Sequence, residues 1–155
     1  MQPLEKDVET LRNIPLFAGL PTARLKLIAY TAEIVSFEPG EVIVRQGDSA
    51  DAVYIITEGE AEVLLTSDEG REIPINTMGR NTLFGEIAVL CQGRRTTTVK
   101  AKEHVVTFKI SARLFLDLVR TSPEIGIQVM TVLAQRLERT THMLQQLQHL
   151  QQERR

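Results

Sequence analysis

The chain has 155 residues, of which 43% are hydrophobic and 25% are charged, and this length and composition fit a single globular domain over residues 1–155. Its net charge of −2 at pH 7 excludes a basic protein that is drawn to nucleic acid by its overall charge. Its one cysteine, Cys91, excludes a disulfide framework or a multi-cysteine metal site within the chain. No secretory signal and no apolar run of about 18 residues is present, so we expect no membrane contact and a cytoplasmic location.

Residues 1–32 are predicted to form two helices. Apolar residues recur at helical spacing at Leu4, Val8 and Leu11, and again over residues 25–29. Segment 14–21 contains two prolines and a glycine, which break a continuous helix. Thr22 is expected to cap the second helix.

Residues 33–110 are predicted to form short antiparallel strands. Seven of the nine glycines fall here, 6 to 12 residues apart, which is the spacing of turns between short strands. Residues 68–71 are typical of a hairpin tip. The runs between turns have strand-like composition: 41–45, 52–56, 61–65, 99–101 and 104–110. The pattern predicts an α+β protein with an antiparallel, jelly-roll-like β-roll between N-terminal helices and a C-terminal helical region.

Residues 111–155 are predicted to be helical. Ser111 is expected to cap one helix, and Pro123 starts another that continues to about Gln152. At 1.5 Å per residue the second helix spans about 45 Å, more than the width of a small domain. Part of it is therefore expected to pack on a partner or to fray.

Residues 84–99 differ from the strands around them. Gly85 allows a turn with close backbone approach, and residues 86–90 favour a short helix whose free N–H groups suit an anion. Arg95 offers a fork of donors suited to phosphate, Thr96 adds a hydroxyl, and Glu86 can accept a hydrogen bond from a sugar hydroxyl. The set fits a phosphorylated sugar, although an ordinary turn followed by a solvated arginine explains the same residues.

A resemblance decides between these interpretations. The run Phe-Gly-Glu at 84–86, the aliphatic residues 87–90 and Arg95-Thr96 resemble the phosphate-binding cassette of the cyclic-nucleotide-binding domain family. Members of this family include the catabolite activator protein, protein kinase A regulatory subunits and cyclic-nucleotide-gated channels. Segments 16–20, 38–48 and 53–63 are similar to other parts of the family pattern, so the resemblance covers roughly residues 11–147.

The resemblance implies a role for each matching residue. Arg95 would bind the cyclic phosphate with Thr96 and the backbone amides of the cassette, and Glu86 and Gly85 would hold the ribose 2′-hydroxyl. The neighbouring Ile87 and Thr97 are assigned to the same site, although Thr97 stands where many members have alanine. The base pocket would be lined by Val63, Leu64 and Leu65. Arg94 is expected to be a solvated neighbour.

Two features bear on the choice of nucleotide. In cGMP-responsive members a threonine at the place of Thr96 contacts guanine, but cAMP binders also have serine or threonine there. Segment 135–141 resembles the long helix of the catabolite activator protein, in which an adjacent threonine and serine contact adenine, and Thr140 and Thr141 match that pair. Two ordinary surface threonines are the alternative. We therefore predict cAMP as the ligand, with cGMP as the alternative.

The last helix also carries the spacing of a coiled coil. Residues at intervals of 3 and 4 form the seam of a two-stranded coil: Met130, Leu133, Leu137, Thr140, Leu144 and Leu147. A homodimer through this helix is therefore predicted, although packing of the helix on its own barrel would give the same pattern. The family's activators continue into a helix-turn-helix domain, for which these 155 residues have no room, so no direct DNA binding is expected. An unidentified effector protein is the further partner considered for this chain.

An enzyme and a protein-interaction module are the two rival functions. An enzyme is not expected, because the serines lie in no nucleophile motif and the histidines at 104, 142 and 149 lack metal-ligand spacing. A ligand-free β-roll that serves only as a protein-interaction module is the second rival. The presence of both Glu86 and Arg95 argues against it.

Overall fold

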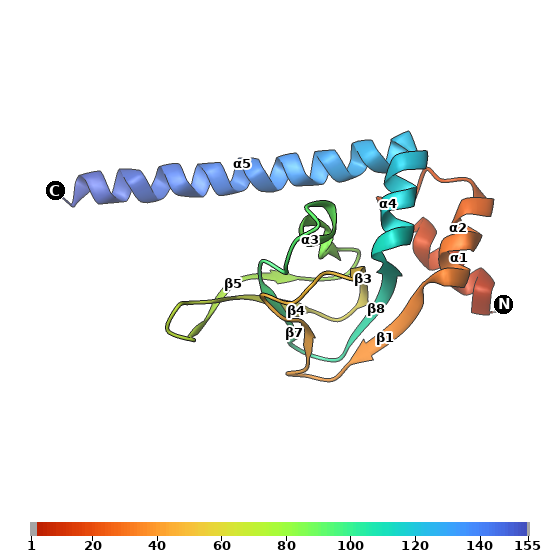
Figure 1. Cartoon of the computed structure of the whole chain (residues 1–155), viewed down its shortest axis with the longest axis horizontal. Coiled ribbons are helices and arrows are strands. Elements are labelled where there is room, and N and C mark those ends of the chain that lie inside the picture. The colour runs from red at the N-terminus through yellow and green to blue at the C-terminus, as the bar shows by residue number, and fades with distance from the viewer. Residues whose placement is uncertain (1–2, 155) are drawn as a thin grey trace.

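The computed structural model describes residues 3–154, in which two helices precede a β-roll and two helices follow it (Figure 1). In chain order the elements are α1 (Pro3–Arg12), α2 (Thr22–Thr31), β1 (Glu33–Phe37), β2 (Val42–Val44), β3 (Ala52–Glu58), β4 (Ala61–Thr66), β5 (Glu72–Met78), β6 (Leu83–Phe84), α3 (Glu86–Leu90), β7 (Thr98–Ala101), β8 (Val105–Ser111), α4 (Ala112–Thr121) and α5 (Pro123–Glu153).

The strands form two four-stranded antiparallel sheets, with the orders β1-β8-β3-β6 and β2-β7-β4-β5. This confirms the predicted α+β fold with an antiparallel β-roll, N-terminal helices and a long C-terminal helix. The cassette, residues 84–99, connects the two sheets, because it begins in β6 of the first sheet and ends in β7 of the second.

Strand β3 is buried on both faces and separates two hydrophobic clusters. Val53 and Ile55 pack with the helices, in a cluster that includes residues of α1, α2, α4 and α5. Tyr54 and Ile56 point the other way, into the cluster between the two sheets. Successive side chains of a strand face opposite sides, so β3 packs against the helices on one face and against the interior of the roll on the other.

The predicted strand runs are all present, with ends that shift by one or two residues. The hairpin at residues 68–71 is also confirmed, with Gly70 at φ +83°. Strands β1, β5 and β6 were not among the predicted runs. β5 contains Pro74 and exposes nearly all its residues, so its composition does not mark it as a buried strand.

Of the two predicted helix caps, Ser111 is confirmed and Thr22 is wrong. The Ser111 hydroxyl accepts a hydrogen bond from the backbone N–H of Leu114, which confirms the cap of α4. Thr22 is not a cap: the N-cap position of α2 belongs to Pro21, and the Thr22 hydroxyl accepts a hydrogen bond from Arg12 instead. The proline fixes an extended backbone just before the helix, so the helix starts one residue earlier than expected.

Helix α5 runs across the top of the molecule in Figure 1 and has two different halves. Ile125 and Val129 in its first half are buried in the helical cluster. From Leu137 to Arg154 every residue is exposed. Arg155 lies outside the described residues. Within residues 3–154 no helix is both long and apolar enough to cross a membrane.

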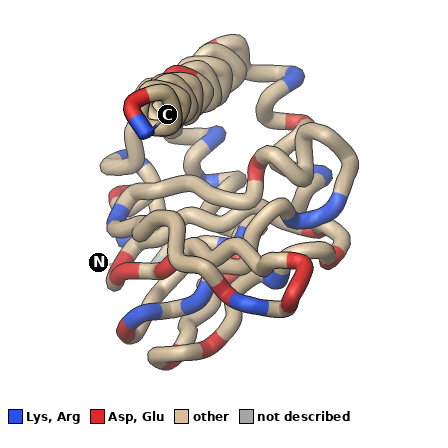
Figure 2. Tube along the Cα trace, turned by 90° about the vertical axis from the view of Figure 1, so that its left-hand side faces the viewer, with Lys and Arg blue, Asp and Glu red and all other residues tan. Residues whose placement is uncertain are grey.

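Acidic and basic residues alternate over the roll in the view of Figure 2, and no large patch of one sign forms there. The same view shows α5 mostly uncharged. Any attraction for an anion therefore has to come from a local arrangement of charges rather than from the field of the whole molecule.

Candidate functional site

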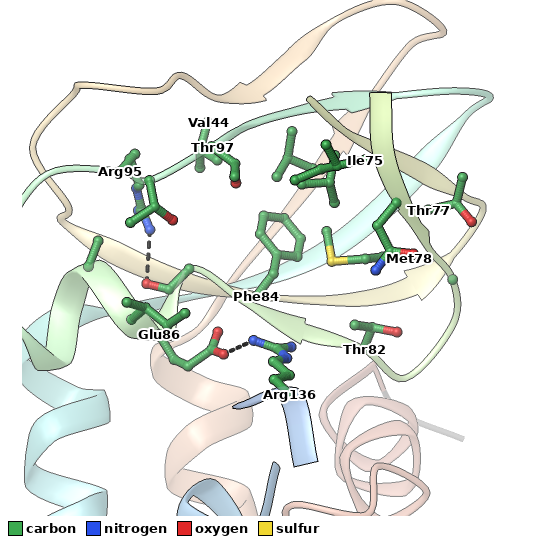
Figure 3. Close-up of a pocket in the computed structure, with 18 of the residues that line it drawn as sticks. Val44, Ile75, Thr77, Met78, Thr82, Phe84, Glu86, Arg95, Thr97 and Arg136 are labelled. Atoms are coloured by element: carbon green, nitrogen blue, oxygen red, sulfur yellow. Dashed lines mark hydrogen bonds and ion pairs between the residues drawn. The ribbon is translucent and has the colours of Figure 1, made fainter. Parts of the chain in front are cut away.

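A cavity of about 430 Å³ lies between the cassette, the second sheet and α5. Its size is within the range of small-molecule sites. Figure 3 shows Arg95 at one end, Thr77 and Met78 at the other, and Phe84 between them. The walls are made by Val44, Val63, Ile75, Asn76, Thr77, Met78, Gly79, Thr82, Phe84, Gly85, Glu86, Ile87, Ala88, Arg95, Thr96, Thr97, Val99, Arg136 and Arg139.

Gly85 forms the sharp turn that starts α3. Its φ of +88° lies in the left-handed region that favours glycine. A Cβ atom on this residue would lie 2.5 Å from Nη1 of Arg95, a side chain that is itself held in place. The turn and the close approach of Arg95 therefore both require glycine. The predicted short helix follows as α3, which keeps Glu86 and Ala88 buried.

Arg95 is a buried cation, 5% exposed, held by backbone carbonyls. Its Nη2 donates to the carbonyl oxygen of Ala52 at 2.6 Å, and its Nη1 donates to that of Gly85 at 3.1 Å. The nearest carboxylate is that of Asp51, 3.8 Å away, and its side chain is 76% exposed. A solvated carboxylate at that distance neutralises the guanidinium weakly, so the site retains positive charge for an anion.

Glu86 is 1% exposed and is bound by α5 (Figure 3). Its Oε1 accepts a hydrogen bond from Nη1 of Arg136, whose Nη2 donates to the carbonyl oxygen of Leu83 at 2.9 Å. Its Oε2 is buried without a partner among the described residues. Burial raises the pKa of the Glu86 carboxyl above its usual range, and the charge of Arg136 opposes that shift. A buried oxygen of this kind is ready to accept a donor from a ligand.

Most of the predicted site residues meet at this cavity. Seven line it: Val63, Gly85, Glu86, Ile87, Arg95, Thr96 and Thr97. Four do not. Leu64 is buried outside the lining, and Leu65 is 40% exposed. Thr140 and Thr141 lie on the exposed half of α5, where the Thr140 hydroxyl donates to the carbonyl oxygen of Arg136 within the helix. Arg94 is exposed and donates to the carbonyl oxygen of Gly47.

Two lining residues on α5, Arg136 and Arg139, were not predicted from the sequence. A signal was present: Arg136 follows the buried residues Ile125 and Val129 by 11 and 7 positions, which places all three on one face of the helix. Residues 75–78 of β5 also line the cavity, and they were not predicted because the strand β5 was not predicted.

The cavity is suited to binding by charge and hydrogen bonds. Its polar groups are guanidinium, carboxylate, hydroxyl and amide, and no group of three or more histidine, cysteine or acidic residues that could hold a metal ion occurs within residues 3–154. A cation, an unpartnered carboxylate oxygen and apolar walls fit a ligand with an anionic group, a hydroxyl and a flat or apolar part.

Comparison with known proteins identifies similar chains. The cAMP-dependent protein kinase regulatory subunit of Blastocladiella emersonii is 32% identical over 108 residues, which are 70% of this chain and 27% of the subunit. The chain thus spans about a quarter of that relative's length.

Two solved structures with the same fold are similar to this chain at 28% and 30% sequence identity. The catabolite activator protein of Thermus thermophilus has a TM-score of 0.76 and 28% identity over 86% of this chain and 62% of its own. The regulatory subunit of a cAMP-independent protein kinase A from Trypanosoma brucei has a TM-score of 0.74 and 30% identity over 86% of this chain and 47% of its own.

A family model for the cyclic nucleotide-binding domain matches residues 34–122, from the start of the first sheet to the end of α4. This range contains the cassette and most of the cavity wall. The chain therefore belongs to the family of cyclic nucleotide-binding domains.

Proposed function

We propose that the chain is a non-catalytic sensor that binds a 3′,5′-cyclic nucleotide, with cAMP as the expected ligand. The observation that carries this proposal is the meeting of buried Arg95 and the unpartnered Oε2 of Glu86 at one cavity. Arg95 favours one negative charge, and Glu86 favours a neutral hydroxyl donor. A cyclic nucleotide has one phosphate charge and one free ribose hydroxyl.

Each part of the nucleotide then has a position. The cyclic phosphate binds Arg95 with the help of Thr96 and the backbone of the cassette, next to Thr97. The ribose 2′-hydroxyl donates to Glu86 beside Gly85. The base lies toward the other end of the cavity, where Val63, Val99 and the strand β5 supply apolar and amide groups.

The choice of cAMP rests on the predicted contact of Thr140 and Thr141 with adenine. Both lie outside the cavity wall, so this contact requires α5 to shift toward the roll. One relative is named as cAMP-dependent and another as cAMP-independent, so family membership leaves the nucleotide open. cGMP is the second candidate, supported by Thr96 at the cavity.

We further propose that binding is signalled by movement of α5. Arg136 joins this helix to Glu86, so a ligand on Glu86 changes the contacts that hold the helix and shifts its population of positions. The exposed Cys91 at the end of α3 is the chain's one cysteine and takes a spin label. A second label at Gln148→Cys reports the distance to α5, and a distance unchanged by saturating nucleotide would refute the movement.

The second half of α5 is proposed to form a parallel homodimer. Leu137, Leu144 and Leu147 in this part of the helix, and Met130 before it, are 55–67% exposed along one seam. Leu133 packs against the cluster of its own chain instead. An exposed apolar stripe of this length marks an interaction surface. Light scattering after size-exclusion chromatography is expected to give twice the chain mass, and a strict monomer at micromolar concentration would contradict the proposal.

Calorimetric titration of the purified chain with cAMP and with cGMP tests the function itself. We expect saturable binding of at least one nucleotide, which chromatography recovers chemically unchanged. Saturable binding of neither would favour the interaction module, and hydrolysed nucleotide would show an enzyme.

A further inference from the structure

Arg139 is a cation at the cavity that the proposed binding scheme leaves unused. It lies three residues after Arg136 on α5 and lines the same cavity. Within residues 3–154 it makes no hydrogen bond or ion pair, whereas Arg136 is held by Glu86 and by the carbonyl oxygen of Leu83.

The charges at the cavity leave Arg139 without an anion. Four charged side chains line it: Glu86, Arg95, Arg136 and Arg139. Glu86 pairs with Arg136, and the single charge of a cyclic phosphate belongs to Arg95 in the proposed function. The donors of Arg139 are therefore available for a neutral part of the ligand.

The positions of Arg95 and Arg136 in the cavity indicate which part of a bound nucleotide lies near Arg139. Arg95 lies at one end of the cavity, and the part of α5 that carries Arg136 approaches closer to Phe84 and Thr82 (Figure 3). A nucleotide with its phosphate on Arg95 and its ribose on Glu86 extends its base away from Arg95. Arg139, about one turn beyond Arg136 on α5, lines the same cavity and is solvent-exposed, so its side chain is available to contact the base in that arrangement.

An arginine distinguishes the two purines by the groups at their edges. Guanine presents two neighbouring acceptors, O6 and N7, which match the fork of a guanidinium group. Adenine presents N7 beside the amine at C6, which is a donor, and a guanidinium has no acceptor for it. We infer that Arg139 reads the base and shifts selectivity toward purines with an oxygen at C6. This inference rests on the proposed function and concerns the ratio of two affinities, so it holds whichever nucleotide binds more tightly.

Calorimetry on four proteins tests this role: the wild-type chain, Arg139→Gln, Arg139→Lys and the control Arg113→Gln, an exposed arginine of α4 that does not line the cavity. Each is titrated with cAMP, cGMP and cyclic IMP, which has the guanine O6 and N7 but no amine at C2. Arg139→Gln is expected to weaken cGMP and cyclic IMP about tenfold and cAMP less than about twofold. Arg139→Lys keeps the charge but loses the fork, so it is expected to lose most of the selectivity as well.

Several results would overturn the inference. Equal weakening of all three nucleotides would mean that Arg139 only attracts the phosphate. An unchanged ratio of cGMP to cAMP affinity in Arg139→Gln, or the same change in Arg113→Gln, would exclude base reading while the proposed function stands. If the wild-type chain binds none of the three nucleotides, the proposed function fails and this inference fails with it.

Discussion

The contact between α5 and the cassette gives the sharpest prediction for stability. Arg136→Met keeps an unbranched apolar stem but removes the guanidinium that holds Oε1 of Glu86. The Glu86 side chain is 2% exposed, so its carboxylate stays in a dry environment without its cation. The pKa of Glu86, already raised by burial, is expected to rise further.

The magnitude follows from the exposure of the two partners. Removal of one partner from a fully buried ion pair costs about 3–5 kcal/mol. Solvent reaches the Arg136 side chain, which is 32% exposed, so the cost is smaller here. We expect Arg136→Met to lower the free energy of unfolding by about 2–3 kcal/mol at pH 7.

Urea unfolding followed by circular dichroism measures this loss. The double variant Glu86→Gln with Arg136→Met is expected to lose less than the sum of the two single variants, by about 1–2 kcal/mol, because the two residues share one contact. Arg139→Gln on the same helix serves as the control and is expected to change stability by less than about 0.5 kcal/mol. A loss below about 0.5 kcal/mol for Arg136→Met, or strict additivity with Glu86→Gln, would refute the reasoning.

Three further predictions concern the turn, the buried carboxyl and the helix seam. Gly85→Ala is expected to cost about 1 kcal/mol or more beyond Gly40→Ala, because both glycines have a similar positive φ but only at Gly85 would the new Cβ meet Arg95; equal losses in urea unfolding would contradict this. Burial raises the pKa of Glu86 in the folded state, so part of the free energy of unfolding should be lost as pH rises from the ordinary glutamate pKa to the raised one. Glu86→Gln should remove this pH-dependent loss. Identical pH profiles of stability for the variant and the wild-type chain would exclude the contribution of Glu86. Leu144→Glu should convert a dimer to a monomer in light scattering, and an unaffected dimer would place the interface elsewhere.

The fold was largely predictable because its signals are local. Glycine spacing marked the turns of the roll, and the apolar runs marked the strands that are buried on at least one face, such as β3. The strand β5 was missed because it is exposed and contains Pro74, so its place in the sheet depends on pairing with β4 rather than on its own composition.

The candidate site was predictable where it is continuous in sequence. Gly85, Glu86 and Arg95 lie within one segment, and the structure brings them to one cavity. Contacts between residues far apart in the sequence were harder to predict. Arg136 is 50 residues from its partner Glu86, and no rule of spacing connects them. Thr140 was chosen for its likeness to the family, but the direction of a helix face depends on how α5 packs, and that packing brings Arg136 to the cavity instead.

The most direct test of the central claim compares two neighbouring arginines. Arg95 is buried at the cavity, whereas Arg94 is exposed and bonded to the carbonyl oxygen of Gly47. Calorimetric titration with cyclic nucleotide is expected to show at least about tenfold weaker binding for Arg95→Gln, from the loss of a charge-assisted contact worth about 1.5–3 kcal/mol. Arg94→Gln is expected to bind like the wild-type chain. Equal affinity in all three proteins, with Arg95→Gln still folded, would contradict the assignment of this cavity as the nucleotide site.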